Sequence, residues 1–345
     1  MTWTQPAYSK SQVDAAGRSL AAGTGSREEL DFALEVLSNW RAAHSFPLNS
    51  IQMELRTKAT GVFGRALIAQ RLKRVPSIVD KLRRLPSMRL SRMQDLGGCR
   101  AVVDTPSQVR RLAHSWTASR TKHALATYKD YIDSPKQSGY RGIHLVYRYI
   151  SEKNIQFNGL LIEVQLRSRL QHAWATAVET VGTFINQSLK SSEGPDAWLQ
   201  FFALAGSAFA FIERTPSVPN TPGDHADTIN QLSDMAARLR VFDTLSAYST
   251  TLKIIEKEVT EGSYFFILAL QLDERELSVH AFPRNQLELA TVNYLHIEKE
   301  QAGVAGAQAV LVAADSIRSL KRSYPNYFLD TEVFATQLQR VLRRE

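Results

Sequence analysis

Residues 159–167, GLLIEVQLR, constrain the fold most, because their apolar and polar side chains alternate along the chain. A period of two predicts a β-strand with one buried face and one polar face. The even-numbered residues from Leu160 to Leu166 would belong to the core. After Leu161, the other face would carry a row of polar groups, Glu163, Gln165 and Arg167. The sequence therefore predicts a sheet with one side buried and one side lined by polar groups.

Helical patterns flank this strand on both sides. Ser26 and Glu29 form a capping box ahead of apolar residues at the i, i+3, i+4, i+7 spacing of an amphipathic helix. Further helices are predicted over residues 49–61, from Pro76, from Pro106, over 170–181 and over 198–212, and further strands over 100–103 and 142–150. We expect an α+β fold, a mixed β-sheet with flanking helices packed on it.

A domain boundary is predicted at residues 214–224, RTPSVPNTPGD, which contain three prolines and one glycine. Beyond this linker, the patterns predict a helix over 228–248, three strands over 252–259, 264–272 and 276–282 joined by short turns, a helix over 285–302, a strand over 309–313 and terminal helical segments. The expected division is residues 1–215, a linker and connecting helix over 216–250, and a smaller α+β domain over 251–345.

The composition is that of a soluble globular protein, with 345 residues of which 44% are hydrophobic. No apolar run approaches the length of a membrane span and no signal peptide is evident, so we expect a cytoplasmic protein without a membrane partner. Cys99 is the only cysteine, which excludes an internal disulfide and a CxxC metal site.

Positive charge is concentrated before Pro216, where 29 Lys and Arg and 17 Asp and Glu give a net charge of +12. From Pro216 onward, 13 basic and 17 acidic residues give −4. A basic body suits a polyanionic partner, and an acidic appendage can mask that body electrostatically.

The segment KDYIDSPKQSGYRGIHL, residues 129–145, combines cations, turn formers and an aromatic ring. Lys129, Lys136 and Arg141 supply charge that pairs with phosphate, and the turn delivers Tyr140 to the start of a strand. A purine base can stack on that ring, because stacking tolerates any base. Taken alone, the segment is equally compatible with a basic surface hairpin.

Two carboxylates and a second group of cations extend this pattern. Asp95 lies just before a predicted buried strand, beside two glycines, and Glu163 lies on the polar face of another strand. Carboxylate oxygens of this kind are suitable Mg²⁺ ligands. The candidate phosphate-binding residues are Arg71, Lys73, Ser77, Lys81 and Arg100. The alternative for such charges is an ordinary solvated surface.

Four of these segments together resemble the synthetase domain of the RelA/SpoT family: RxKxxxSxxxK at 71–81, DLGGCR at 95–100, YKDYIDSPKQSGYRGIH at 128–144 and EVQLRS at 163–168. The resemblance covers roughly residues 25–212. It implies a nucleotidyltransferase-like synthetase fold that transfers pyrophosphate from ATP to a ribose 3′-hydroxyl with Mg²⁺.

The resemblance also implies roles for individual residues. Asp95 and Glu163 would be catalytic and would bind the metal, with Glu163 activating the acceptor hydroxyl. ATP would be bound by Arg71, Lys73, Ser77, Lys81 and Arg100. The acceptor would be bound by Tyr140, which stacks on its base, and by Lys136, Arg141, His144 and Gln165. His144 is equally compatible with an ordinary strand histidine bonded to the backbone.

The C-terminal motif SYPNYFLD places Tyr324 and Tyr327 in a YxxY arrangement that resembles the neutralising element of CapRel proteins, in which a toxic synthetase is fused to its antitoxin. That resemblance implies a pseudo zinc finger over residues 252–282 and tyrosines that cover the ATP site. It further implies the tRNA CCA end as acceptor, and release of the toxin by a phage protein, such as a capsid protein, as antiphage defence. Arg83, Arg84 and Arg89 are the candidate tRNA-binding surface.

Two alternatives stay open at this stage. The chain is also compatible with a (p)ppGpp or (p)ppApp alarmone synthetase carrying a C-terminal regulatory domain. A catalytically inactive nucleotide or RNA sensor is disfavoured, because both carboxylates are present. Hydrolase activity is not expected, since the sequence contains no adjacent His-Asp pair.

Overall fold

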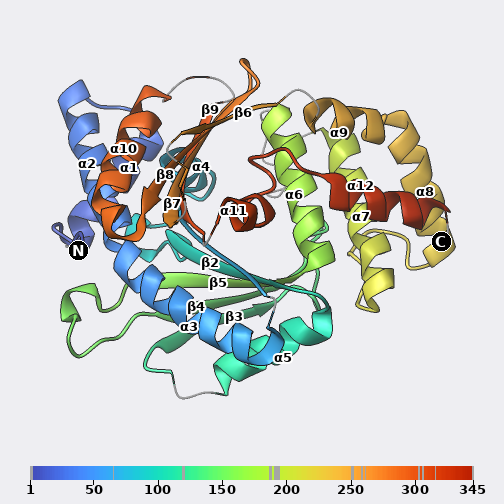
Figure 1. Ribbon diagram of the computed structural model, residues 1–345, viewed down its shortest axis with the longest axis horizontal. Coiled ribbons are helices and arrows are strands. Elements are labelled where there is room, and N and C mark those ends of the chain that lie inside the picture. The colour runs from blue at the N-terminus through green and yellow to red at the C-terminus, as the bar shows by residue number, and fades with distance from the viewer. Residues whose placement is uncertain are drawn as a thin grey trace.

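One sheet joins strands from both halves of the chain (Figure 1). The computed structural model describes residues 3–64, 66–118, 121–185, 189, 195–249, 252–257, 259, 260, 262–301, 304, 307–314 and 316–343. Within these residues the sheet has the order β3–β4–β5–β2–β1–β9–β7–β8–β6. The strands are β1 (Leu67–Leu72), β2 (Gly97–Val103), β3 (Ala124–Asp130), β4 (Ile143–Arg148), β5 (Leu161–Ser168), β6 (Lys253–Lys257), β7 (Ser263–Gln271), β8 (Glu276–Pro283) and β9 (Ala307–Ala313).

The sheet is mixed, as predicted. β2 pairs with β5 in parallel, and β6 pairs with β8 in parallel, whereas the other neighbours are antiparallel. The alternation in β5 is confirmed, because Ile162, Val164 and Leu166 are completely buried. In the parallel register Glu163 lies opposite Gly98 of β2, which places the polar face of β5 beside the start of β2.

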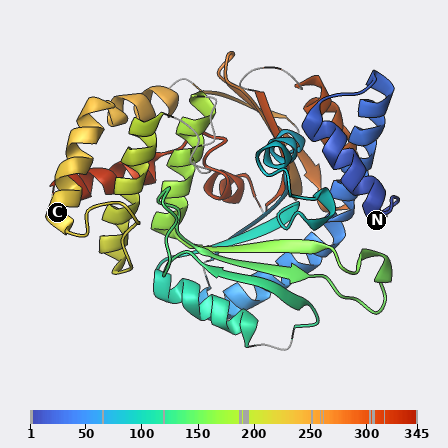
Figure 2. The same ribbon diagram turned by 180° about the vertical axis from the view of Figure 1, so that it is seen from behind.

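Helices cover both faces of the sheet. They are α1 (Lys10–Ala22), α2 (Arg27–Ala43), α3 (Ser45–Phe63), α4 (Val75–Arg84), α5 (Pro106–Thr117), α6 (Arg169–Phe184), α7 (Asp196–Glu213), α8 (His225–Arg238), α9 (Val241–Ser249), α10 (Leu287–Glu300), α11 (Ile317–Ser323) and α12 (Glu332–Arg343). The helices α3 and α5 pack on β2 and β5, and α10 packs on β7, β8 and β9. The group α6–α9 and α12 lies at the opposite end of the molecule from α1, α2 and α10 (Figures 1 and 2).

No helix among the described residues has both the length and the apolar character needed to cross a membrane.

Several elements differ from the sequence-based expectation. The single helix expected over residues 228–248 is two helices, α8 and α9, because Arg240 between them has a φ of 48°, a left-handed conformation that interrupts a right-handed helix. The pattern did not predict β3, an edge strand whose mostly exposed residues show no clear apolar alternation. It also did not predict α1, although Ser9 and Gln12 form a capping box there.

The three strands expected over 252–259, 264–272 and 276–282 are present as β6, β7 and β8, but they do not pair in chain order. β6 pairs with β8 instead of with β7. The physical reason is that β7 already has β8 on one edge and β9 on the other, so that β6 can join only the outer edge of β8.

The segment expected to be a linker packs on α7. Residues 214–224 contain no helix or strand, but Val218 is buried and its N–H donates to the Ser207 hydroxyl at 2.8 Å. Beyond this segment, β9 joins the sheet beside β1, and α12 packs on α6 and α8. Residues 251–345 therefore share one sheet and one core cluster with the N-terminal part instead of forming an independent layer. The placement of domain boundaries at 215 and 250 stays a prediction.

The contact between the two parts of the sheet is narrow. β1 and β9 pair through two positions, Gln70 with Ala313 and Arg71 with Val312. By comparison, β1 pairs with β2 along its whole length, from Leu67 to Leu72.

A buried ion pair reinforces this contact. Arg41 of α2 is 2% exposed and lies 3.0 Å from Glu298 of α10. The Tyr294 hydroxyl accepts from Arg41 at 3.0 Å and donates to Glu298 at 2.6 Å. Glu298 also accepts the N–H of Val75, the first residue of α4, at 3.1 Å. A single carboxylate thus connects α10 to both α2 and α4.

Glu298→Gln is expected to lower the free energy of unfolding by about 3 kcal/mol, because it leaves the buried Arg41 without a countercharge. Urea unfolding measures this loss. Glu300→Gln on the same helix is the matched control, since its partner His296 and Glu300 itself are 70% and 63% exposed. Exposed pairs contribute little, so the control should change stability by less than about 1 kcal/mol. Equal losses in the two variants would contradict the role given to Glu298.

Candidate functional site

A cavity of about 510 Å³ lies on the polar face of β1, β2, β4 and β5. The described residues that line it include eight lysines and arginines: Arg71, Lys73, Lys81, Arg84, Arg100, Lys129, Lys136 and Arg167. Three carboxylates also line it, Asp95, Glu163 and Glu179. The excess of cations makes this cavity electrostatically suited to a polyanionic ligand.

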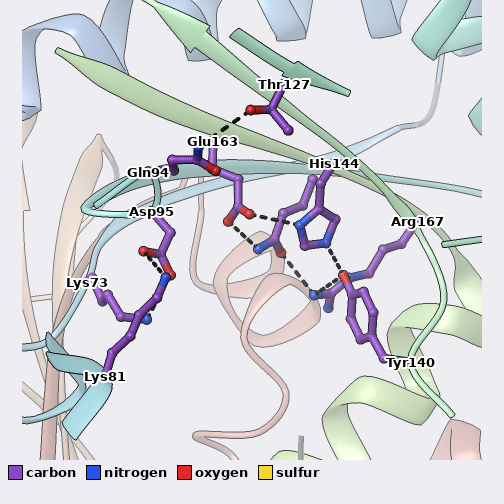
Figure 3. A network of polar contacts seen from close by, with 10 residues as sticks. Lys73, Lys81, Gln94, Asp95, Thr127, Tyr140, His144, Glu163 and Arg167 are labelled. Atoms are coloured by element: carbon purple, nitrogen blue, oxygen red, sulfur yellow. Dashed lines mark hydrogen bonds and ion pairs between the residues drawn. The ribbon is translucent and has the colours of Figure 1, made fainter. Parts of the chain in front are cut away.

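Asp95 lies between two lysines. It precedes β2, and its two carboxylate oxygens accept from Lys73 at 3.0 Å and from Lys81 at 2.8 Å (Figure 3). Lys73 follows β1 and Lys81 lies on α4, so three elements meet at this carboxylate. Burial alone would raise the pKa of Asp95, but the charges of Lys73 and Lys81 outweigh burial and hold the pKa well below its usual range.

Glu163 belongs to a closed ring of hydrogen bonds (Figure 3). One carboxylate oxygen lies 2.8 Å from His144 Nδ1, and the other accepts from Gln165 at 2.7 Å. Burial alone would raise the pKa of Glu163, but the His144 imidazole and the Gln165 amide hold it below the value of an ordinary glutamate. The charge of Asp95 acts in the opposite direction, which shows that the two carboxylates are electrostatically coupled.

The turn before β4 is fixed by close packing on α7. Gly139 has a φ of 93°, and a Cβ there would come within 2.6 Å of the Phe202 carbonyl oxygen. Only glycine tolerates both the conformation and the contact. The turn closes with hydrogen bonds between Lys136 and Gly139 at 2.9 Å and between Lys136 and Tyr140 at 3.2 Å. This packing fixes where the Tyr140 ring enters the cavity.

Most of the predicted site residues come together in this cavity. Its lining contains the predicted catalytic pair Asp95 and Glu163, together with Arg71, Lys73, Lys81, Arg100, Lys136, Tyr140, His144, Gln165 and Tyr324. Of the three arginines expected on a tRNA-binding surface, Arg84 lines the cavity, and Arg83 and Arg89 line other hollows.

Three of the residues predicted to bind ATP, to bind the acceptor or to inhibit the site do not line the cavity. Arg141 is 2% exposed and is ion-paired with Glu213 of α7 at 2.6 Å, so its guanidinium serves the packing of α7 and is not free for a phosphate. Ser77, in the first turn of α4, is not part of the lining. Tyr327 is 1% exposed and belongs to an apolar cluster with β7 and β9.

Tyr140 does not offer an open stacking surface in this structure. The ring is 5% exposed and contacts the rings of Tyr131, His144 and Trp174 at their edges. Lys136 Nζ lies 5.4 Å from its centroid and the Arg167 guanidinium carbon lies 5.1 Å away. A base would therefore have to displace one of these cations, and stacking on Tyr140 stays a prediction.

Tyr324 lies where the C-terminal region meets the cavity. Its hydroxyl donates to the Gln70 carbonyl at 2.6 Å, and the Arg100 guanidinium lies 5.6 Å from its ring centroid. Arg100 also donates to the Ser323 carbonyl at the end of α11. Burial lowers the pKa of Arg100 to about 10.

Two charged residues that line the cavity, Arg167 and Glu179, were missed by the sequence-based assignment. Arg167 is 4% exposed and belongs to the same hydrogen-bonded ring as Glu163, and its place in the polar row of β5 was a usable signal. Glu179 lies on α6; burial alone would lower the pKa of Arg71, but the charge of Glu179 together with neighbouring groups outweighs burial and raises it. The signal there was a lone carboxylate in the otherwise uncharged helical segment HAWATAVETVG.

Comparison with known proteins places most of the residues that line this cavity within a recognised region. Residues 70–182 match the profile of a family described as "Region found in RelA / SpoT proteins". The GTP pyrophosphokinase YjbM of Bacillus subtilis is 31% identical over 111 residues, which are 32% of this chain and 52% of that protein. The uncharacterized protein Mb1401 of Mycobacterium bovis is 28% identical over 131 residues, 38% of this chain and 44% of that protein. This chain spans about half the length of the curated relatives it matches.

Solved structures of small alarmone synthetases are also similar to this chain. Synthetase 1 from Bacillus subtilis, bound to its product pppGpp, has a TM-score of 0.40 and 23% identity, and covers 49% of this chain and 90% of its own. Synthetase 2 from the same organism has a TM-score of 0.43 and 20% identity, and covers 51% of this chain and 93% of its own.

The RelA/SpoT resemblance is thus confirmed for the region of residues 70–182, which contains Asp95 and Glu163. Tyr324 and Tyr327 lie outside the matched region.

The low pKa of Asp95 predicts a pH-dependent contribution to stability. Its ion pairs stabilise the folded state fully above the pKa of an unfolded aspartate, roughly 4, and this stabilisation is lost as the pH falls below that value. The Asp95→Asn variant lacks this stabilisation at every pH. The difference in unfolding free energy between wild type and Asp95→Asn should therefore be larger near neutral pH than below roughly pH 4 in urea unfolding.

Asp80→Asn is the matched control, since Asp80 and its partner Arg83 are 64% and 54% exposed. This variant should match wild type across the pH range. A difference between wild type and Asp95→Asn that stays constant as the pH falls would contradict the ion-pair assignment.

Proposed function

We propose that this protein is a pyrophosphotransferase that moves a pyrophosphoryl group from ATP to a ribose 3′-hydroxyl. The observation that carries this proposal is the pairing of Asp95 and Glu163 in one cavity that eight cations line, inside the region that matches RelA/SpoT proteins. The name of the Bacillus relative, a GTP pyrophosphokinase, supports the same reaction class.

The residues fit the chemistry of this transfer. A ribose hydroxyl is a poor nucleophile near pH 7, and Glu163, with its lowered pKa, is an ionised carboxylate that accepts the hydroxyl proton. Arg71, Lys73 and Lys81 line the same cavity and neutralise the charge of the phosphates of ATP, the donor of the pyrophosphoryl group.

The carboxylates also suit Mg²⁺. Carboxylate oxygens are the ligands that this ion prefers, and it is commonly held by one or two carboxylates together with substrate phosphates. Each oxygen of Asp95 and Glu163 accepts one hydrogen bond and keeps a lone pair for a further partner. Asp95 and Glu163 would hold the ion, which when bound supplies charge neutralisation at the transferred group.

In protein opened by replacing Tyr324 and Tyr327 with Ala, Asp95→Asn and Glu163→Gln are each expected to reduce pyrophosphate transfer from labelled ATP on the order of a hundredfold or more, because each removes a charge that stabilises the transition state. Asp80→Asn and Glu152→Gln, two exposed carboxylates outside the cavity, are the matched controls. A variant of Asp95 or Glu163 that folds and retains wild-type transfer would show that the catalytic pair is assigned incorrectly.

For the acceptor, we favour the 3′ end of tRNA. The support is the net charge of +12 before Pro216, which suits a partner with many phosphates. The same assay therefore compares tRNA with GDP and GTP as acceptors. Transfer to tRNA that falls steeply with salt supports this choice, whereas transfer to GDP or GTP supports the alternative, an alarmone synthetase.

The C-terminal region is proposed to be an intramolecular antitoxin. Tyr324 lines the cavity, its hydroxyl is bound to the β1 backbone, and the end of α11 engages Arg100. Such a tethered segment has a high effective concentration, so modest contacts suffice to keep ATP out. A phage protein, with a capsid protein as the candidate, would release the toxin by binding the open form more tightly and thereby stop translation.

Replacing Tyr324 and Tyr327 together by Ala is expected to make the full-length protein toxic to growing bacteria without any phage, because ATP gains access to Arg100. Adding Asp95→Asn to that variant should restore growth. The measurement is colony formation after induction, with protein levels checked by immunoblot. Normal growth with a stably expressed double alanine variant would show that inhibition does not reside in these tyrosines.

A further inference from the structure

We propose that Arg167 and Tyr140 are positioning residues, which orient the Glu163 carboxylate through two chains of hydrogen bonds that start at Arg167. We call these chains arms. The Tyr140 hydroxyl belongs to one of them and thereby helps to orient Glu163. This inference rests on the proposed function, in which Glu163 accepts the proton of the acceptor hydroxyl.

The first arm runs from Arg167 through Tyr140 and His144 to Glu163 (Figure 3). Arg167 Nε and Nη2 donate to the Tyr140 hydroxyl oxygen at 3.2 Å and 3.1 Å. The Tyr140 hydroxyl is hydrogen-bonded to His144 Nε2. His144 Nδ1 lies 2.8 Å from one oxygen of Glu163.

The second arm runs from the same arginine through Gln165. Arg167 Nη2 donates to Gln165 Oε1 at 2.9 Å, and Gln165 Nε2 donates to the other oxygen of Glu163 at 2.7 Å. Both carboxylate oxygens are therefore held, each by a separate arm. β5 carries Glu163, Gln165 and Arg167 at alternate positions, so the three side chains lie on the same face of the strand. This face supplies the carboxylate, the glutamine that connects it to the arginine, and the arginine at which both arms start.

With a neutral His144, the donors and acceptors of the ring are consistent with a single arrangement of protons. Arg167 can only donate, and ionised Glu163 can only accept. Tyr140 therefore accepts from Arg167 and donates to His144 Nε2, which leaves the His144 proton on Nδ1 to donate to Glu163. Each bond in both arms points from the guanidinium toward the carboxylate, and such a chain polarises its members cooperatively.

Burial supports a role beyond packing. Arg167 is 4% exposed, and none of its hydrogen bonds among the described residues goes directly to a carboxylate. A buried cation without direct compensation is costly, and an apolar side chain would fill the space at lower cost. The two arms connect this cation to Glu163, which explains why it is placed here.

The experiment compares Tyr140→Phe with Tyr140→Leu in the pyrophosphate transfer assay, in protein opened by replacing Tyr324 and Tyr327 with Ala and with whichever of tRNA and GDP is the acceptor. Loss of the hydroxyl in Tyr140→Phe is expected to lower kcat about tenfold to a hundredfold with little change in the acceptor KM, as for partners that orient a catalytic carboxylate. If the ring instead serves to stack a base, Tyr140→Phe keeps wild-type kcat and KM and only Tyr140→Leu raises KM, which would overturn the proposal.

Tyr147→Phe is the matched control. Tyr147 lies on β4, the strand that carries His144, its ring is buried on the face opposite to His144, and its hydroxyl has no hydrogen-bond partner among the described residues. Removing this hydroxyl should leave kcat and KM at wild-type values. A loss equal to that of Tyr140→Phe would show that both variants act by disturbing β4.

Arg167→Lys tests the arginine at which both arms start. A lysine keeps the charge but lacks the planar fork that reaches both arms, so kcat is again expected to fall while the acceptor KM stays within twofold. In the background of Glu163→Gln, neither Tyr140→Phe nor Arg167→Lys should reduce the residual rate further. Additive losses would overturn the assignment of both residues to Glu163.

Unfolding experiments separate this inference from the proposed function. Tyr140→Phe and Glu163→Gln should lower the urea midpoint by less together than the sum of their separate effects, because they belong to one network. Strict additivity would overturn the proposal whatever the activity. Protein in which Tyr324 and Tyr327 are both replaced by Ala and which still transfers no pyrophosphate to any acceptor would overturn the proposed function, and the stability coupling would still decide whether the arms position Glu163.

Discussion

Eight cations around one cavity repel one another, and the architecture of the site follows from how that repulsion is balanced. Asp95 takes two lysines at once, Glu179 of α6 counters the charge of Arg71, and Glu163 of β5 counters that of Lys136. These carboxylates come from separate elements, so the fold must bring a loop, a strand and a helix to the same place. The parallel pairing of β2 with β5 does so, since it aligns the start of β2 with Glu163.

The C-terminal region contributes to the same balance with neutral groups. The Ser323 carbonyl accepts from Arg100, and Tyr324 binds the backbone of β1 beside Arg71. On the other side of the sheet, Glu298 neutralises Arg41 and holds the first residue of α4, the helix that carries Lys81. The region that we propose as an antitoxin therefore both covers the cavity and supports the segment that shapes it.

Sequence patterns predicted the elements that depend on local periodicity and missed the features that depend on tertiary contacts. The alternation in β5 correctly placed its core residues, and the same alternation correctly put Glu163 and Gln165 on the cavity face. Arg141 was assigned wrongly to the cavity because its neighbourhood in sequence is basic, whereas its partner Glu213 is 72 residues away. The pairing of β9 with β1 has no local signature either, since any apolar strand can pair with an open edge.

The contacts of α11 indicate which interface between elements would separate if the cavity opened. Leu320, Tyr327 and Phe328 pack in a cluster made mainly of β7, β8 and β9 residues, with Ala69 as its one buried member from β1 among the described residues. Moving α11 off those strands would expose this apolar cluster, which is unfavourable. Separating α11 together with β9 from β1 instead breaks two residue pairs, the bonds of Tyr324 and Arg100, and the contacts of Arg74 with Gln308 and of His172 with Arg322. The buried pair of Arg41 and Glu298 lies beside the same interface, so it opposes opening there and would add to the binding energy that the proposed trigger must supply.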